Sequence, residues 1–329
     1  MLRSVLRPLN VLLLVAAALL ALPAGADTVY VASFTTGELI SYDSADPAGT
    51  KTVLLPGGSL VSPGALALGP DGNLYIGENG DGSSFAPRVS KYEPATLTLS
   101  TVYPFASFEV FPGSLVFQGT DLLIGRNPFF SNIGPIVKLA NATGGPLAVS
   151  DYTTGGSLAS SPGLALAADG RLYVSDQTYT FGSGIASGPV KRFDAAGGYI
   201  GEVIADGASG LAGPTGLAIN GTTLYTASIM TGSILQTDLT TDTTTAFATT
   251  GSPFEAGTVA LLSDGGLLVG SPSGTGNIYH FSAGGTLLST FASGLGQIGG
   301  IATVPEPGTG IAAGAAAAAF WFVRRRQRT

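Results

Sequence analysis

One short phrase recurs along this chain and restricts its possible folds more than any other feature. Its clearest copy is Pro162–Asp176, PGLALAADGRLYVSD, in which an apolar run, an Asp-Gly pair and a second alternating run follow one another. Asp-Gly between two such runs predicts a β-hairpin with a two-residue turn, because the turn needs a residue that tolerates a positive φ. Further copies lie at Pro63–Glu78, Pro112–Arg126, Pro214–Ser228 and Gly257–Ser271.

The spacing of these copies predicts the architecture. Corresponding residues of the first run are separated by 49, 49, 53 and 42 positions, at Ala67, Val116, Ala165, Ala218 and Ala260. A sixth copy is divided, with its first half around Ala302 and its second half at Thr28–Ser33. Two more short runs follow each copy, and four strands per unit at this period are typical of a propeller blade. The sequence therefore predicts an all-β, six-bladed β-propeller with four-stranded blades, closed by a blade that is split between the two ends of the chain.

The N-terminal segment has the composition of a signal peptide. Arg3 and Arg7 precede the apolar run Val11–Leu22, and the small residues Ala24 and Ala26 follow it. A basic region, an apolar region and a small-x-small site predict a signal peptide over residues 1–26 and a propeller over residues 27–304. An uncleaved membrane anchor is the alternative.

The C-terminal segment, residues 305–329, predicts a second membrane element. The apolar stretch Thr309–Val323 is slightly shorter than a typical membrane span, and the cluster Arg324, Arg325 and Arg326 directly after it would stay in the cytoplasm. We therefore expect a short transmembrane helix here.

The order of motifs in this tail resembles the PEP-CTERM sorting signal of exopolysaccharide-producing Gram-negative bacteria. The resemblance rests on Pro305, Glu306 and Pro307, then the apolar stretch, then the arginine cluster. It implies that an exosortase, a membrane transpeptidase, recognises the tail. It also implies that the C-terminal helix holds the protein in the inner membrane before processing, after which the protein reaches the cell surface or the extracellular matrix.

The repeated phrase itself is similar to the NHL repeat and to related six-bladed propellers of the gluconolactonase group. This resemblance covers nearly all of residues 27–304 and implies the fold, but such propellers include hydrolases, lyases and binding modules. In the metal-dependent lactonases, Asn and Asp in the loops before the innermost strands hold a divalent cation. Here those positions carry Pro, Gly, Phe and Thr, so the resemblance does not extend to the ligand set.

One face of the predicted ring carries the candidate binding residues. The end of each second strand and the start of each innermost strand share a face, with the Asp-Gly turns on the opposite one. We therefore single out Glu78, Asn79, Arg126 and Asp176 as candidates for binding. Glu78 and Asp176 are weak candidates for Ca²⁺ or another divalent cation. The simpler interpretation is that Glu78 pairs with Arg126 of the next blade and that Asp176 caps a loop.

Composition excludes several functions. Six of the 14 basic residues lie in the end segments, so eight remain against 21 acidic residues between Asp27 and Glu306, a net charge of −13. An acidic ring repels polyphosphate, which argues against nucleic-acid binding. The chain has no cysteine and one histidine, His280, so no catalytic residue can be assigned. We expect a non-catalytic binding or scaffold module for extracellular polysaccharide or a surface protein; the alternative is a divalent-metal-dependent lactonase or hydrolase.

Overall fold

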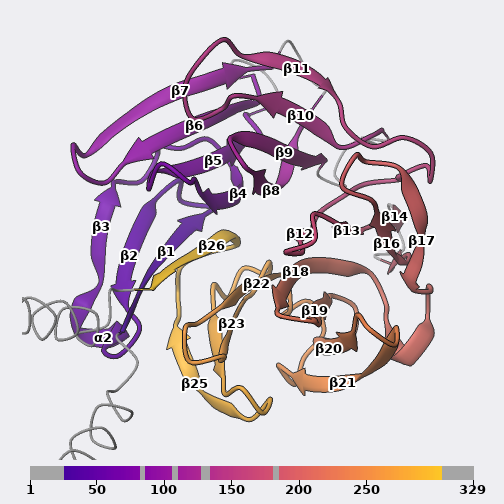
Figure 1. The fold of residues 1–329 in the computed structure, drawn as a ribbon. Helices are drawn as coiled ribbons and strands as arrows, with labels where there is room; N and C mark the ends of the chain where they lie inside the picture. Colours follow the sequence, from indigo (N-terminus) through magenta and orange to yellow (C-terminus); the bar gives the residue numbers. More distant parts are fainter. Residues whose placement is uncertain (1–25, 82–85, 106–109, 127–133, 181–184, 306–329) are drawn as a thin grey trace, which may run out of the picture.

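The computed structural model describes residues 26–81, 86–105, 110–126, 134–180 and 185–305. In this part of the chain, six four-stranded antiparallel sheets are arranged as blades around a central channel (Figure 1). The predicted six-bladed propeller of four-stranded blades is therefore confirmed. None of the helices in the described ranges is long and apolar enough to cross a membrane.

The first blade contains both ends of the described chain. Yellow β26 lies beside indigo β1 in Figure 1, and the two strands pair from Asp27 opposite Pro305 to Ser33 opposite Ile298. The split blade is thus confirmed, and pairing the two ends leaves no open gap in the ring. The elements of this blade are β26 (Ile298–Pro305), β1 (Asp27–Ser33), β2 (Leu39–Asp43), the single helical turn α2 (Pro47–Thr50) and β3 (Thr52–Leu55).

The other blades follow in chain order, each from its innermost to its outermost strand. Blade 2 contains β4 (Pro63–Leu68), β5 (Leu74–Glu78), β6 (Arg88–Glu93) and β7 (Thr98–Pro104). Blade 3 contains β8 (Pro112–Gln118), β9 (Asp121–Arg126), β10 (Val137–Ala140) and β11 (Ala148–Asp151). Blade 5 contains β18 (Pro214–Asn220), β19 (Thr223–Ser228), β20 (Ser233–Asp238) and β21 (Thr243–Thr249). Blade 6 contains β22 (Thr258–Leu261), β23 (Leu267–Gly270), β24 (Ile278–Phe281) and β25 (Leu287–Ala292).

Blade 4 carries a small additional hairpin that the repeat pattern did not predict. A two-stranded sheet is inserted between its second and third strands. The elements are β12 (Leu164–Leu166), β13 (Leu172–Ser175), the inserted β14 (Thr178–Thr180) and β15 (Ile185–Ser187), β16 (Val190–Phe193), β17 (Tyr199–Ile204) and the short 3₁₀ turn η1 (Ala208–Gly210).

The Asp-Gly turns differ from the two-residue turns that we expected. In blade 4, Ala167 N–H bonds to the Arg171 carbonyl oxygen, which leaves a three-residue loop ending at Gly170 with a φ of +84°. A type I turn followed by a left-handed glycine is the usual geometry of a three-residue hairpin loop. The loops at Gly72 and Gly265 have the same geometry, with φ values of +76° and +85°. Glycine is still required, but one position later than in a two-residue turn.

Packing between neighbouring blades forms the core. The tyrosine of the repeated phrase is buried wherever it occurs in the second strand of blades 2, 4 and 5. In blade 2, Tyr75 lies edge-on to Phe117 of blade 3, with ring centroids 4.8 Å apart. In blade 1, Val31 and Ile40 pack into one cluster with Leu268 of blade 6. Each blade therefore buries its two faces against its neighbours, which is why one apolar phrase per blade suffices for the fold.

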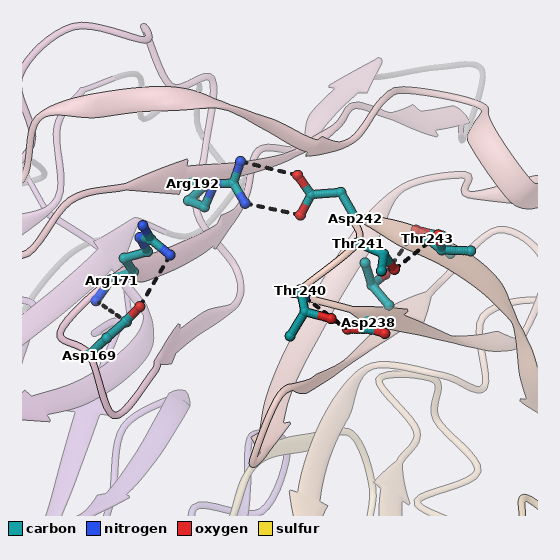
Figure 2. A network of polar contacts seen from close by, with 10 residues as sticks. Asp169, Arg171, Arg192, Asp238, Thr240, Thr241, Asp242 and Thr243 are labelled. Carbon is teal, nitrogen blue, oxygen red and sulfur yellow. Dashed lines mark hydrogen bonds and ion pairs between the residues drawn. The ribbon is translucent and has the colours of Figure 1, made fainter.

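Polar contacts also join blades on the face that carries the Asp-Gly turns. Arg192 of β16 forms a bidentate ion pair with Asp242, in the turn between β20 and β21 of the next blade, with N–O distances of 3.0 and 3.2 Å (Figure 2). Asp169 and Arg171, on the hairpin turn of blade 4, pair with each other nearby.

Both ends of the described chain lie on one face of the ring, the face that carries the Asp-Gly turns. Asp27 and Pro305 lie at the turn face: β1 runs from there to the opposite face, and the antiparallel β26 runs back from the opposite face and ends there. Pro305, which we assigned to the tail, is the last residue of β26. The predicted signal peptide up to Gly25, together with Glu306, Pro307 and the arginine cluster, lies outside the described residues.

Candidate functional site

A pocket of about 680 Å³ lies on the face opposite the Asp-Gly turns. Its apolar walls include Phe34, Phe111, Phe254 and Pro162. A second cavity, of about 320 Å³, continues along the innermost strands and shares Gly113 and other lining residues with the first. The pocket is therefore the mouth of the central channel, on the face where the sequence predicted a site.

The pocket residues follow the repeat. In each blade we call the last residue of the second strand, or in blades 4 and 6 the residue directly after it, the exit residue; these are Ser33, Glu78, Arg126, Asp176, Ser228 and Ser271. The residue directly after it lines the pocket in five blades, and in the third blade that position lies outside the described ranges. Successive side chains of an extended chain point to opposite sides, so an exit residue that points into its blade turns the next side chain toward the channel. The five lining residues are Phe34, Asn79, Gln177, Ile229 and Pro272.

The exit residue Glu78 holds its own blade together. Its side chain is fully buried and accepts hydrogen bonds from the Val61 backbone N–H at 2.7 Å and from the Ser90 hydroxyl at 2.5 Å. Arg88 adds two bonds, at 2.7 and 3.0 Å, from the neighbouring strand β6. The ion pair that we expected between Glu78 and Arg126 is therefore wrong, since Glu78 pairs with Arg88 one strand away.

Two further exit residues, Asp176 and Ser228, repeat this pattern. Asp176 accepts a bond from the Ala159 N–H at 2.7 Å, as expected for a residue that caps a loop, and pairs with Lys191 at 2.5 Å. The Ser228 hydroxyl accepts a bond from the Ala212 N–H at 2.9 Å. Each of these residues fixes the loop that leads into the innermost strand of its own blade, and this loop forms part of the pocket rim.

Arg126 also forms hydrogen bonds with neighbouring loops of the propeller. Its guanidinium Nε donates to the Pro135 carbonyl oxygen at 2.9 Å, and its backbone N–H donates to the Ser161 hydroxyl at 2.6 Å. Of the four residues that the sequence singled out for binding, only Asn79 lines the pocket. The other three lie behind its wall.

Asn79 differs from every other residue of the pocket wall. Its side chain is 7% exposed, and neither polar atom of its carboxamide has a hydrogen-bond partner among the described residues. Gly64 leaves room for it, because a Cβ at that position would collide with Nδ2. Thr258 also lines the pocket, but its hydroxyl, which is likewise without a partner in the described part of the chain, lies against Gly270 inside blade 6. By contrast, Gln177 donates from Nε2 to the Pro214 carbonyl oxygen at 3.1 Å.

Glu255 places a negative charge directly behind the pocket wall, and the sequence analysis missed it. Its carboxylate is 8% exposed and accepts hydrogen bonds from the hydroxyls of Ser273, Thr275 and Tyr279, at 2.6 to 3.2 Å. Burial by itself raises the pKa of Glu255, but these hydroxyl donors outweigh burial and hold the pKa below its usual value. No ion pair neutralises Glu255 within the described ranges. Lone acidic residues are common in loops, so no sequence signal marked this one.

The carboxylates on this face do not fit a divalent cation. Calcium takes six to eight oxygen ligands, usually including several carboxylate oxygens. Both oxygens of Glu78 and of Asp176 are already engaged by cationic and N–H donors. Over the described part of the chain, three or more His, Cys, Asp or Glu side chains do not come together in one place. His280 lies on β24 beside the ring of Phe291, away from the pocket lining.

Comparison with known proteins supports the fold. No protein-family model matches this chain, and no curated protein is similar to it by sequence. Among solved structures, it is similar to a chain in the crystal structure of a nidogen/laminin complex, with a TM-score of 0.67 and 12% sequence identity over 84% of this chain and 98% of that one. At this identity the similarity concerns the fold alone. Fold and pocket together define a six-bladed β-propeller with a mostly apolar pocket at one mouth of its channel.

Proposed function

We propose that this protein is a non-catalytic binding module that takes a partner into the pocket at the channel mouth. The observation that carries the proposal is the wall of that pocket, which combines aromatic and proline side chains with an unpartnered carboxamide at Asn79. Pockets of this kind, mostly apolar with a few polar groups, are typical of binding sites. The exit carboxylates are engaged in holding the blades, which leaves them poorly suited to acid–base or metal chemistry.

The position of the chain ends supports presentation of this pocket. Asp27 and Pro305 lie on the turn face, and the strands that begin and end there cross the ring to the pocket face. Strands of seven and eight residues span about 25 Å at ~3.3 Å per residue. A protein attached through either end would direct the pocket away from its attachment.

We propose further that the chain is exported by its N-terminal signal peptide and sorted by an exosortase through its PEP-CTERM tail to the cell surface or matrix. NHL-like repeats would then form the exposed domain. Deleting residues 324–328 is expected to impair C-terminal processing and surface retention in a host with this sorting system. Unchanged processing, followed by mass spectrometry of the mature protein, would argue against this assignment.

A surface-attachment assay tests the binding function. Fluorescently labelled full chain is added to cells and matrix of the producing bacterium, and the retained protein is measured. Ile229→Trp, at a half-buried position of the wall, is expected to fill the pocket and abolish retention. Asp242→Asn, on the opposite face, is expected to retain binding, because its φ of +53° also suits asparagine. Equal retention of both variants would refute a role for the pocket.

Calorimetry addresses the enzymatic alternative. We expect no tight stoichiometric binding when Ca²⁺ is titrated into the full chain. One tightly bound equivalent that is lost in Glu78→Ala would favour the metal-dependent lactonase or hydrolase.

A further inference from the structure

We propose that the pocket recognises an extended peptide segment of a partner protein, in which a lysine or arginine neighbours an aliphatic residue. This inference rests on the proposed binding function and specifies its ligand class. The backbone of the peptide would pair with the Asn79 carboxamide, its aliphatic side chain would lie between the aromatic walls, and its cation would face the Glu255 side of the pocket.

The carboxamide of Asn79 carries the first step. Because a carboxamide offers one acceptor and two N–H donors, it can bond in parallel to the N–H and C=O of a single extended peptide residue. Both atoms lack partners within the described residues. A buried amide without partners costs stability, so a protein that retains one gains from any ligand that pairs with it.

The apolar walls favour a peptide over a sugar. A sugar ring displays hydroxyl groups around its edge, and each needs a polar partner when it leaves water. Several polar groups of this wall are already used: Gln177 Nε2 bonds to Pro214, the Thr215 hydroxyl lies 3.2 Å from the Ala256 carbonyl oxygen, and Ser273 donates to Glu255. Apart from Asn79, Thr258 and Gln297, the remaining wall consists of phenylalanine, proline, isoleucine, alanine and glycine, which matches an aliphatic side chain.

The negative charge of Glu255 favours a lysine or arginine in the bound peptide. Glu255 lies one hydroxyl behind the wall, since Ser273 both lines the pocket and donates to this carboxylate at 2.6 Å. Its donors are neutral hydroxyls, so its charge is not cancelled within the described part of the chain. The net charge of −13 between Asp27 and Glu306 adds a long-range attraction for a cationic segment.

A synthetic peptide library tests the inference directly. The probe is a positional-scanning library of acetylated, amidated hexapeptides, which carries no terminal charges, and the full chain is the binding protein. We expect the strongest binding from peptides in which Lys or Arg neighbours Leu, Ile or Val. For the best of these, Asn79→Leu is expected to weaken binding about tenfold, the value of roughly one to two lost hydrogen bonds.

The role of Glu255 has its own readout. In the wild type, the best lysine peptide should bind at least about fivefold more tightly than the same peptide with norleucine in place of lysine, and added salt should reduce this ratio. Glu255→Gln should bring the ratio close to one. Ser273→Ala provides a second variant that keeps the charge and should preserve the preference. Asp242→Asn is the charge-matched control on the opposite face, and urea titration of each variant establishes that it is folded.

The possible outcomes distinguish the proposal of a peptide ligand from the more general proposal of a binding module. Peptide binding that is unaffected by Asn79→Leu, or a norleucine preference, would overturn the proposed recognition. A second outcome is that no peptide binds, while Ile229→Trp and periodate treatment of the matrix each abolish retention on cells. The module then binds a polysaccharide, and the proposal of a peptide ligand is wrong. If Ile229→Trp changes nothing on cells, the binding function itself fails.

Discussion

Replacing Asn79 with leucine should stabilise the free protein. Leucine has nearly the same shape as asparagine, and the backbone N–H of residue 79 keeps its bond to the Ser62 carbonyl oxygen at 3.1 Å. The substitution removes the carboxamide of a residue that is only 7% exposed, and this carboxamide has no partner among the described residues. An unpaired buried polar group costs about 1–3 kcal/mol. We therefore expect the free energy of unfolding to rise by about 1–2 kcal/mol.

The assay is urea denaturation followed by circular dichroism. A rise in the midpoint with an unchanged slope reports a change in stability rather than in the compactness of the unfolded state. In a thermal melt the same gain corresponds to about 2–8 °C, at roughly 2–4 °C per kcal/mol for a domain of this size. Gln177→Met is the matched control. It occupies the equivalent position in blade 4, but its amide is paired with Pro214, so its loss should destabilise the protein by about 1 kcal/mol.

One result would refute the reasoning. If Asn79→Leu lowers the unfolding free energy as Gln177→Met does, the Asn79 carboxamide is satisfied in the free protein and is not reserved for a ligand. A stabilised variant that also loses peptide binding would show that the pocket exchanges stability for recognition, as functional sites commonly do.

Three further predictions concern the contacts that hold the blades. Glu78→Gln leaves the largely buried Arg88 without its counter-ion and should lower the free energy of unfolding by about 3 kcal/mol in urea. Glu93→Gln breaks the more exposed pair with Lys91 and should lower it far less; similar losses would contradict the difference in burial. Because the folded-state pKa of Glu255 lies below its ordinary value of 4.5, its contribution to stability is present above that pH and is lost as the pH falls through the lower folded value. The stability difference between wild type and Glu255→Gln should therefore shrink in urea titrations as the pH is lowered from about 6 to about 3, and a constant difference would contradict the assignment. Arg192→Lys removes the bidentate geometry of the ion pair with Asp242, whose side chain is 41% exposed. The free energy of unfolding should therefore fall by less than about 1 kcal/mol in urea, and a larger fall would show that this contact holds the two blades together.

The local repeat in the sequence was sufficient to predict the architecture. An apolar run, a turn and a second run specify a hairpin through interactions between near neighbours, and the period of the copies specifies the number of blades. The division of one copy between Thr28–Ser33 and the region of Ala302 predicted the pairing of β1 with β26, which the structure confirms. The face of the site was predictable for the same reason, because strand direction follows from the order of the runs.

Contacts between different strands and blades were decided only by the tertiary structure. The sequence placed Glu78, Asn79, Arg126 and Asp176 together as one polar group, yet only Asn79 lines the pocket. Glu78 had two arginines within reach, and pairing of β5 with β6 places Arg88 directly opposite it.

The pocket wall depends on the closed ring, and the setting of the charge behind it depends on contacts within blade 6. Phe34, Phe111 and Phe254 lie far apart in the sequence and come together only around the channel. Glu255 acquires its hydroxyl donors within blade 6, where the loop before β22 meets the loop between β23 and β24 and the side chain of Tyr279 on β24. Local periodicity fixes strands and turns because neighbouring residues determine them. Side-chain partners depend on which faces the packing brings together, and that information is spread over the whole chain.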